Sequence, residues 1–270
     1  MTFAVIGGDR RQAELAQLLA SGGAAVVTYG LGAGGGTLEE ASGADVVLLP
    51  LPLSKEKGRL NCREDPMLLT DLFARLRPDQ RILAGQVTQA EHRLAAEYRL
   101  CIEDYFQREE LTISNAAITA DCALEMAAER LGRPLPSTLV LGFGRIGKLL
   151  CSRLQRQGVE VTAAARKAED LRWIKAYGYR AVEIGELSGR LSGFGLLLNT
   201  VPAMVLPGPL AAELRGFCID LASQKGVELP EGERYIWARG LPGKIAPKAA
   251  AQAIRETVEH ISSEQRGDNA

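Results

Sequence analysis

A glycine-rich segment in the middle of the chain constrains the fold more than any other feature. Residues 140–147 read Val-Leu-Gly-Phe-Gly-Arg-Ile-Gly and end a short apolar run. This G-x-G-x-x-G pattern is typical of a strand, a tight turn and a helix that together cradle a dinucleotide. The first glycine permits the turn, the second lets the backbone approach a pyrophosphate, and the third lets the helix pack against the strand. The predicted cofactor-binding residues of this segment are Gly142, Phe143, Gly144, Arg145, Ile146 and Gly147.

The position of this segment predicts a second domain. About 140 of the 270 residues precede it, and apolar runs alternate with helical patterns on both sides, which predicts an α/β protein with two doubly wound parallel-sheet domains. We expect residues 1–115 to form an N-terminal, flavodoxin-like substrate domain and residues 132–245 to form a Rossmann NAD(P)-binding domain. An inter-domain helix is predicted at residues 116–131. Residues 246–270 are predicted as a C-terminal helix that returns to the first domain, with a tail, and we expect ligands in the cleft between the domains.

The expected elements follow from hydrophobic periodicity and helix-end signals. Asp9 is placed to cap the first helix, and Gly132 with Pro134 ends the long helix before the glycine segment. Predicted strands cover residues 3–7, 24–29, 46–49, 82–84 and 100–102 in the first domain, and residues 138–141, 159–164, 181–182, 196–199, 218–221 and 235–238 in the second. Further helices are predicted at residues 90–98 and 247–262.

Composition excludes several classes of function. A net charge of −1 argues against a nucleic-acid or anionic-membrane surface. No apolar run reaches the about 20 residues of a spanning helix, and no basic segment precedes the first apolar run. The five cysteines are odd in number and form no C-x-x-C pair, so we expect reduced thiols, no metal site and a cytoplasmic location.

The end of the second strand of the nucleotide unit favours NADP over NAD. An NAD-binding unit places an acid there, about 20 residues after the glycines, to hold the ribose 2′-hydroxyl. This chain has Arg166 and Lys167 instead. Two cations suit a 2′-phosphate, and the guanidinium offers a planar fork.

The chain lacks the base of a 2-hydroxy-acid dehydrogenase. Its two histidines, His92 and His260, fall in amphipathic helical stretches far from any motif. No histidine lies near residues 240–243, where such an enzyme would place its base. Near the predicted cleft, Lys244 and Lys248 flank the entry to the last helix and are suited to carboxylates.

Several segments together resemble one family, the A subunit of dipicolinate synthase. They are residues 4–12, 141–147, 164–166, 199–204, 220–223 and 240–248, and they span nearly the whole chain in order. The resemblance implies an enzyme of the mother cell of a spore-forming bacterium. It implies NADP-dependent oxidation, acting on a CH–CH bond, of a dihydrodipicolinate-type intermediate of the lysine (diaminopimelate) pathway to dipicolinate. It further implies a flavoprotein-like partner, the B subunit of dipicolinate synthase, and we also expect a homo-oligomer.

Aromatising such a ring needs no strong base, so we expect the site mainly to hold two carboxylates in a near-attack pose. Lys248 and Lys244 are the candidate catalytic cations, and Asp121 is the candidate proton acceptor. The expected substrate-binding residues are Ser54, Gly85, Gln86, Asn115, Thr119, Ser223 and Gly243. The residues expected to border the nicotinamide are Asn199, Thr200, Val201, Pro202, Leu221 and Ala222.

Two alternatives remain open from the residues. One is a shikimate-type NADP dehydrogenase, because residues 199–204 are similar to that family's cofactor turn and Lys55 follows a strand. That family's serine-rich N-terminal motif is missing here. The other is a catalytically inactive, NADP-binding regulatory subunit, which the scarcity of titratable residues near the predicted cleft favours.

Overall fold

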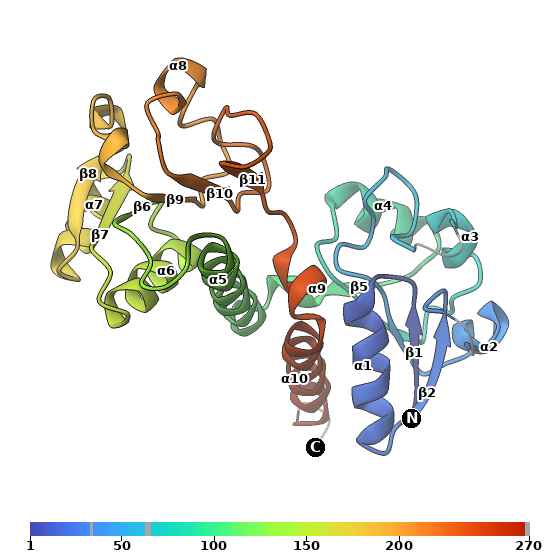
Figure 1. The fold of residues 1–270 in the computed structure, drawn as a ribbon. Helices are drawn as coiled ribbons and strands as arrows, with labels where there is room; N and C mark the ends of the chain where they lie inside the picture. The colour runs from blue at the N-terminus through green and yellow to red at the C-terminus, as the bar shows by residue number, and fades with distance from the viewer. Residues whose placement is uncertain (33–34, 63–65, 268–270) are drawn as a thin grey trace. The chain divides into compact units, whose positions relative to one another are not determined.

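The chain folds into two compact α/β units. A computed structural model describes residues 1–32, 35–62 and 66–267. The first unit is formed by Met1–Asn115 with Pro242–Ala270, and the second by Ala116–Leu241 (Figure 1). The last three residues of the predicted tail, 268–270, lie outside the described residues.

The first unit is built on a five-stranded, wholly parallel sheet. Its order, β2-β1-β3-β4-β5, is the doubly wound order of flavodoxin-like domains. The chain therefore winds in opposite directions from β1 and β3, and their carboxyl ends diverge at the switch point of the sheet. The strands are β1 (Thr2–Ile6), β2 (Ala25–Tyr29), β3 (Val46–Leu48), β4 (Arg81–Ala84) and β5 (Ile102–Asp104).

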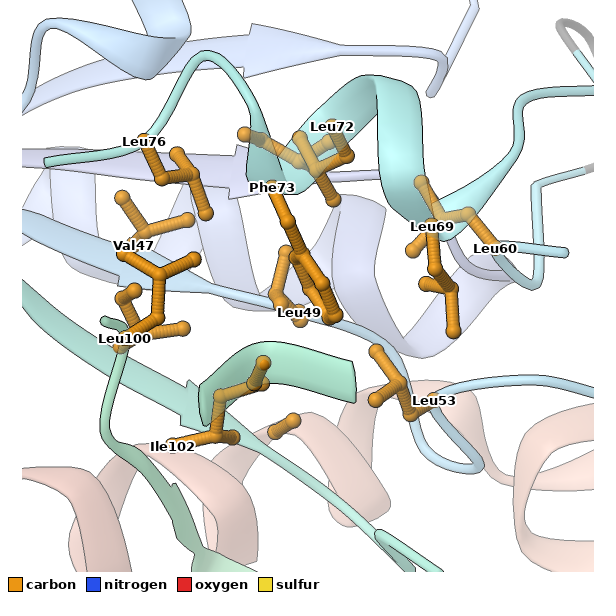
Figure 2. Packing of buried hydrophobic residues seen from close by; sticks show 14 of the residues in the cluster. Val47, Leu49, Leu53, Leu60, Leu69, Leu72, Phe73, Leu76, Leu100 and Ile102 are labelled. Atoms are coloured by element: carbon orange, nitrogen blue, oxygen red, sulfur yellow. The ribbon is translucent and has the colours of Figure 1, made fainter. Parts of the chain in front are cut away.

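Helices cover both faces of this sheet. Figure 2 shows one face, where Val47 and Leu49 pack with Leu72 and Phe73 in a cluster of buried apolar side chains. On the other face, the C-terminal helix packs against the first helix of the chain. Burial of this apolar surface is the main stabilising term of the unit. Its helices are α1 (Arg10–Ser21), α2 (Leu38–Ser42), α3 (Leu69–Phe73), α4 (Gln89–Glu97), α10 (Pro247–Gly267) and the 3₁₀ turn η1 (Tyr105–Gln107), with α9 (Leu241–Ile245) beginning at the unit boundary.

The second unit is built on a six-stranded parallel sheet. Its order, β11-β10-β9-β6-β7-β8, is the Rossmann order, with β6 as first strand and the switch point between β6 and β9. Its short helical elements are α8 (Gly208–Ala211) and the 3₁₀ turns η2 (Ile184–Glu186) and η3 (Leu191–Gly193). Its other elements are β6 (Thr138–Leu141), β7 (Val161–Ala165), β8 (Arg180–Glu183), β9 (Leu196–Asn199), β10 (Phe217–Asp220), β11 (Tyr235–Trp237), α6 (Arg145–Arg156) and α7 (Ala168–Ala176). The helix α5 (Glu109–Leu131) begins in the first unit and continues into the second.

The predicted fold class of two doubly wound parallel sheets is confirmed, as is the C-terminal helix packed on the first unit. Several element boundaries differ from the prediction, and two of these differences have a clear local cause. The strand predicted at residues 100–102 begins only at Ile102, because Leu100 still closes the end of α4 with a hydrogen bond to Ala95 and Arg99 adopts φ +59°. The long helix predicted from residue 116 begins at Glu109, where acidic residues favour the helix N-terminus.

Asp9 caps α1, as predicted, and also binds a side chain. Its carboxylate accepts from the backbone N–H of Arg11 and pairs with the Arg11 guanidinium at 2.8 Å. Burial tends to raise the pKa of the Asp9 carboxyl, but the hydrogen bonds and charge of Arg11, with a further contribution from Lys55, bring it below its ordinary value. A carboxyl with a lowered pKa stabilises the fold above its unfolded pKa and loses that contribution as the pH falls through its folded pKa.

We therefore expect Asp9→Asn, which keeps a capping oxygen, to lower the free energy of unfolding by about 1–2 kcal/mol at pH 7. The deficit should shrink as the pH falls below about 4, the ordinary Asp value. Urea unfolding followed by circular dichroism at pH 7 and pH 3 measures both. Asp79→Asn removes an exposed ion pair with Arg77 and should cost less than about 0.5 kcal/mol. An equal loss at both pH values would contradict the assignment of the effect to charge.

Candidate functional site

The residues expected at the cofactor gather at one edge of the second sheet. Parallel strands carry their carboxyl ends to the same edge, and β7, β6, β9 and β10 are consecutive neighbours with β6 central. The glycine segment follows β6 and the pair Arg166 and Lys167 follows β7. Residue 199 is the last residue of β9, and residues 200–202 follow it. Residues 221–223 follow β10. The fold thus brings four segments that are distant in the sequence to the switch point where ligands of such sheets bind.

The three glycines of the loop have different physical roles. Gly142 has φ +91°, and a Cβ there would meet the Thr200 hydroxyl oxygen at 2.5 Å. A Cβ at Gly147 would lie 2.1 Å from the carbonyl oxygen of Gly142, so α6 can start this close to β6 only with glycine. At Gly144 a Cβ would meet nothing within 4 Å. The first and third glycines therefore shape the loop, whereas the second leaves open space beside its backbone.

That open space lies at the start of a long helix. Gly144 is the N-cap of the 12-residue helix α6 and provides no side-chain cap for the first turn. The N–H groups of a first turn have no partner within the helix, and the helix dipole favours an anion there. An uncapped helix start beside open space fits a pyrophosphate.

Phe143 contributes its backbone rather than its ring to this loop. The ring is buried, lies 5.9 Å from the Tyr177 ring and 6.2 Å from the Tyr179 ring, and has the Lys148 ammonium 5.8 Å from its centroid. Aromatic contacts of this kind hold a side chain in one place. The packing therefore anchors the residue between the first two glycines of the loop.

A buried polar network shapes the loops after β9 and β10. Asn199 and Asp220 are fully buried, and the amide of Asn199 donates to the Asp220 carboxylate at 2.8 Å. Asp220 also accepts from the backbone N–H groups of Ala222 and Gly226 at 3.1 and 2.8 Å, and Asn199 accepts from that of Val201 at 3.0 Å. The sequence interpretation missed Asp220, although a carboxylate at the end of a buried apolar strand was the available signal.

Two further contacts close this edge of the sheet. The Thr200 hydroxyl donates to the carbonyl of Leu141 at 2.8 Å, which ties the loop after β9 to the start of the glycine loop. The Trp237 indole N–H donates to the carbonyl of Ala222 at 2.9 Å. Backbone held at several points in this way is preorganised for a ligand, because little ordering remains to be done on binding.

Arg166 and Lys167 are both exposed and follow the last residue of β7 directly. Lys167 is also the N-cap of α7 and makes no side-chain cap. The acids nearest in sequence, Glu169 and Asp170, lie inside the first turn of α7. The strand end therefore presents cations where an NAD site presents a carboxylate.

The first unit carries its own set of predicted residues after β3 and β4. The Ser54 hydroxyl donates to the carboxylate of Glu91. Gly85 is buried, and a Cβ there would lie 2.6 Å from a Leu51 methyl carbon. Gln86 is exposed at φ +54°, a backbone conformation that is strained for a side-chain-bearing residue and is found most often at functional sites.

The other predicted residues of the first unit lie around the break between α9 and α10. A Cβ at Gly243 would lie 2.8 Å from Nε of Arg11, so α9 meets the start of α1 at this glycine. Lys244 and Lys248 are exposed on either side of the break. Lys248 lies in the first turn of α10, which has no acidic residue, and a cation there opposes the helix dipole. A cation at such a position is suited to binding an anion.

The structure ties the predicted proton acceptor to another side chain. Asp121 on α5 is paired with Arg153 through both carboxylate oxygens, at 2.5 and 3.0 Å. Asn115 and Thr119 lie one turn apart on the same helix, and Thr119 is buried. Ser223 is exposed in the loop after β10.

The thiols form no disulfide, and one of them is deeply buried. All five cysteines are free, and burial raises the pKa of Cys151 to about 12, so this thiol stays protonated at neutral pH. Within the described residues, no group of three or more His, Cys, Asp and Glu side chains is arranged to hold a metal ion. Among the helices of that same part of the chain, none is long and apolar enough to cross a membrane.

Two wound parallel-sheet units, one with a glycine loop open to a phosphate, define a two-domain protein of the dehydrogenase-like Rossmann type. The crystal structure of an L-alanine dehydrogenase shares this fold, with a TM-score of 0.64 and 14% identity over 95% of this chain and 87% of that one. Residues 2–106 match the family model of the N-terminal domain of the dipicolinate synthase A subunit.

The similarity to this family extends over the whole chain. The A subunit of dipicolinate synthase from Bacillus subtilis (strain 168) is 24% identical over 286 residues, covering 98% of this chain and 96% of the relative. The crystal structure of the corresponding protein from Bacillus halodurans superposes with a TM-score of 0.80 at 22% identity, over 96% of this chain and 97% of that one. The resemblance drawn from the sequence is thereby confirmed.

Substitutions at two glycines of the loop should affect NADP binding and stability separately. Gly144→Ala should fold with nearly unchanged melting temperature but bind NADP at least about tenfold more weakly, because its methyl group would occupy the phosphate space. Gly147→Ala should instead lower stability by about 3 kcal/mol, because its methyl group meets a backbone carbonyl. Thermal melting and calorimetric NADP titration measure the two effects. Undiminished NADP binding by folded Gly144→Ala would refute the proposed cradle.

Proposed function

We propose that this chain is the A subunit of a dipicolinate synthase and uses NADP to oxidise a dihydrodipicolinate-type ring to dipicolinate. The similarity to the Bacillus subtilis protein over the full length of the chain carries this proposal. The open glycine loop at the switch point of the second sheet supports it independently, because it suits a dinucleotide.

NADP, when bound, supplies the hydride acceptor for this reaction. The pyrophosphate would lie on the first turn of α6 beside Gly144, where the helix start is uncapped. Arg166 and Lys167 would hold the 2′-phosphate. The loops at residues 199–202 and 221–223, held by Asn199 and Asp220, would border the nicotinamide.

The proposed reaction suits a site without a strong base. Removing a hydride and a proton from a dihydropyridine ring makes it aromatic, so the proton can leave to water or to a weak acceptor. The protein then mainly has to hold two carboxylates in a reactive pose, which can supply much of the rate. Asp121 remains a proposed acceptor, and its carboxylate is paired with Arg153.

Cations and polar backbone of the first unit would bind the substrate. Lys248, in the first turn of α10, and Lys244, at the end of α9, would bind carboxylate oxygens. The remaining residues that we propose for the substrate are Ser54, Gly85, Gln86, Asn115, Thr119, Ser223 and Gly243.

The wider setting of the proposal follows from the same similarity. Because the Bacillus subtilis relative is the A subunit of its synthase, we propose that this chain has the B subunit for its partner, and that this partner is flavoprotein-like. We further propose a homo-oligomer in the cytoplasm of the mother cell during sporulation, acting on an intermediate of the lysine pathway.

An activity measurement tests the proposed reaction directly. Aspartate semialdehyde and pyruvate are condensed in situ, and this chain and NADP are added. We expect NADPH absorbance and the dipicolinate chromophore to rise together, at a rate proportional to the amount of chain. Shikimate in place of the condensation product should give no NADPH. NADP binding without turnover, with and without the B subunit, would instead identify an inactive regulatory protein.

The choice between NADP and NAD has its own prediction. Arg166→Asp should weaken NADP binding about 10- to 100-fold and NAD binding less than threefold, because only NADP carries the phosphate that the guanidinium would bind. Arg172→Asp, which changes an exposed arginine on α7, is the matched control and should alter neither value. Calorimetric titration of each dinucleotide gives the four constants. A similar loss for both dinucleotides on Arg166→Asp would contradict the assignment.

A further inference from the structure

One guanidinium in the first unit is held in an unusually defined orientation. Arg11 lies in the first turn of α1, and its Nε and Nη2 donate to the two carboxylate oxygens of Asp9 at 2.9 and 2.8 Å. Nη2 also donates to the backbone carbonyl of Leu51. Within the described residues, no hydrogen bond or ion pair is formed by Nη1. The planar group is therefore fixed along one side and retains donors on the other.

The guanidinium lies where a doubly wound sheet binds its ligands. Asp9 and Arg11 follow β1, and Leu51 follows β3, so the contact joins the two loops that diverge at the switch point of the first sheet. The Tyr105 hydroxyl donates to the carbonyl of Leu49 at 3.0 Å and further fixes the β3 loop. Burial raises the pKa of Tyr105, so the hydroxyl remains a neutral donor.

The neighbouring residues pack closely against the guanidinium and add positive charge at this place. Gly243 of α9 faces the guanidinium, and a Cβ there would lie 2.8 Å from Nε. Lys244 follows it on the same short helix, and Lys55 is close enough to lower the pKa of the Asp9 carboxyl. The single carboxylate of Asp9 is therefore accompanied by two cations, the Arg11 guanidinium and the Lys55 ammonium. They lie near the N-terminal end of the 12-residue helix α1.

Two other acids near this sheet edge, Glu91 and Asp104, are already hydrogen-bonded. Glu91 accepts from the Ser54 hydroxyl and from the backbone and hydroxyl of Thr88. Asp104 accepts from the backbone N–H groups of Gln86 and Val87 at 3.0 and 2.9 Å. These two carboxylates hold the loops after β3 and β4.

We propose that Arg11, oriented by Asp9 and Leu51, binds one carboxylate of the substrate through Nη1. The inference rests on the proposed function, because it assigns a residue to the dicarboxylate of that reaction. Asp9 acts here as a positioning residue that sets the plane of the guanidinium. A lysine cannot replace this arrangement, because an ammonium lacks the planar fork that binds Asp9 on one side and a ligand on the other.

Binding of dipicolinate and of picolinate, which lacks one carboxylate, tests this role. Both are titrated by calorimetry against the full chain saturated with NADP, for the parent, Arg11→Gln and Arg11→Lys. The control is Arg10→Gln, which removes the adjacent exposed arginine. We expect Arg11→Gln to weaken dipicolinate binding at least about tenfold and to abolish the preference for dipicolinate over picolinate. Arg10→Gln should change neither, and NADP affinity should be unchanged throughout.

The decisive measurement is the ratio of the affinity for dipicolinate to that for picolinate. A merely structural role of Arg11 would weaken the binding of both ligands alike. If Arg11→Gln does not fold, Arg11→Lys, which keeps a cation, must still show a reduced preference. A parent that makes and binds dipicolinate, with an unchanged preference in the Arg11 variants, would overturn the role of Arg11 and leave the proposed function intact. A parent that neither binds nor makes dipicolinate would overturn both.

Discussion

The close approach of α6 to β6 is the contact on which the proposed nucleotide site depends. Gly147 can sit against the carbonyl of Gly142 only because it has no Cβ, and this lets the helix start directly above the strand end. The same approach leaves the first-turn N–H groups of α6 without a side-chain cap beside the open space at Gly144. A charged side chain is then unnecessary at the pyrophosphate, because the backbone supplies both the donors and the field.

The two units shape the loops at the edge of their sheets by different means. Each has a parallel sheet whose switch point gathers loops at one edge. In the second unit the edge is shaped by buried polar groups, where Asn199 and Asp220 satisfy each other and the backbone of the neighbouring loops. In the first unit the turn after β1 lacks the third glycine of the G-x-G-x-x-G pattern and carries Asp9 and Arg11 instead. Side-chain cations rather than backbone amides then supply the positive field.

Much of the local structure around the proposed nucleotide site was predictable because its signals are local. The spacing of three glycines after an apolar run indicates the strand, turn and helix, and the cations after β7 follow from sequence position alone. The helix cap at Asp9 was likewise readable from its residue type. The start of α5 was not, because Thr112 and Ile113 have weak helix propensity and the burial of Leu111 and Ala116 outweighs it.

The sequence by itself determined the order of strands and helices and the place of the glycine loop, because each depends on residues close together in the chain. Tertiary structure alone decided which loops become neighbours. The parallel pairing of β6 with β9 and of β9 with β10 gives Asp220 its role, and the pairing of β1 with β3 brings Leu51 to Arg11. Such contacts join residues tens of positions apart. No local sequence pattern encodes them, because they form only when the strands pair into sheets and the packed helices exclude water.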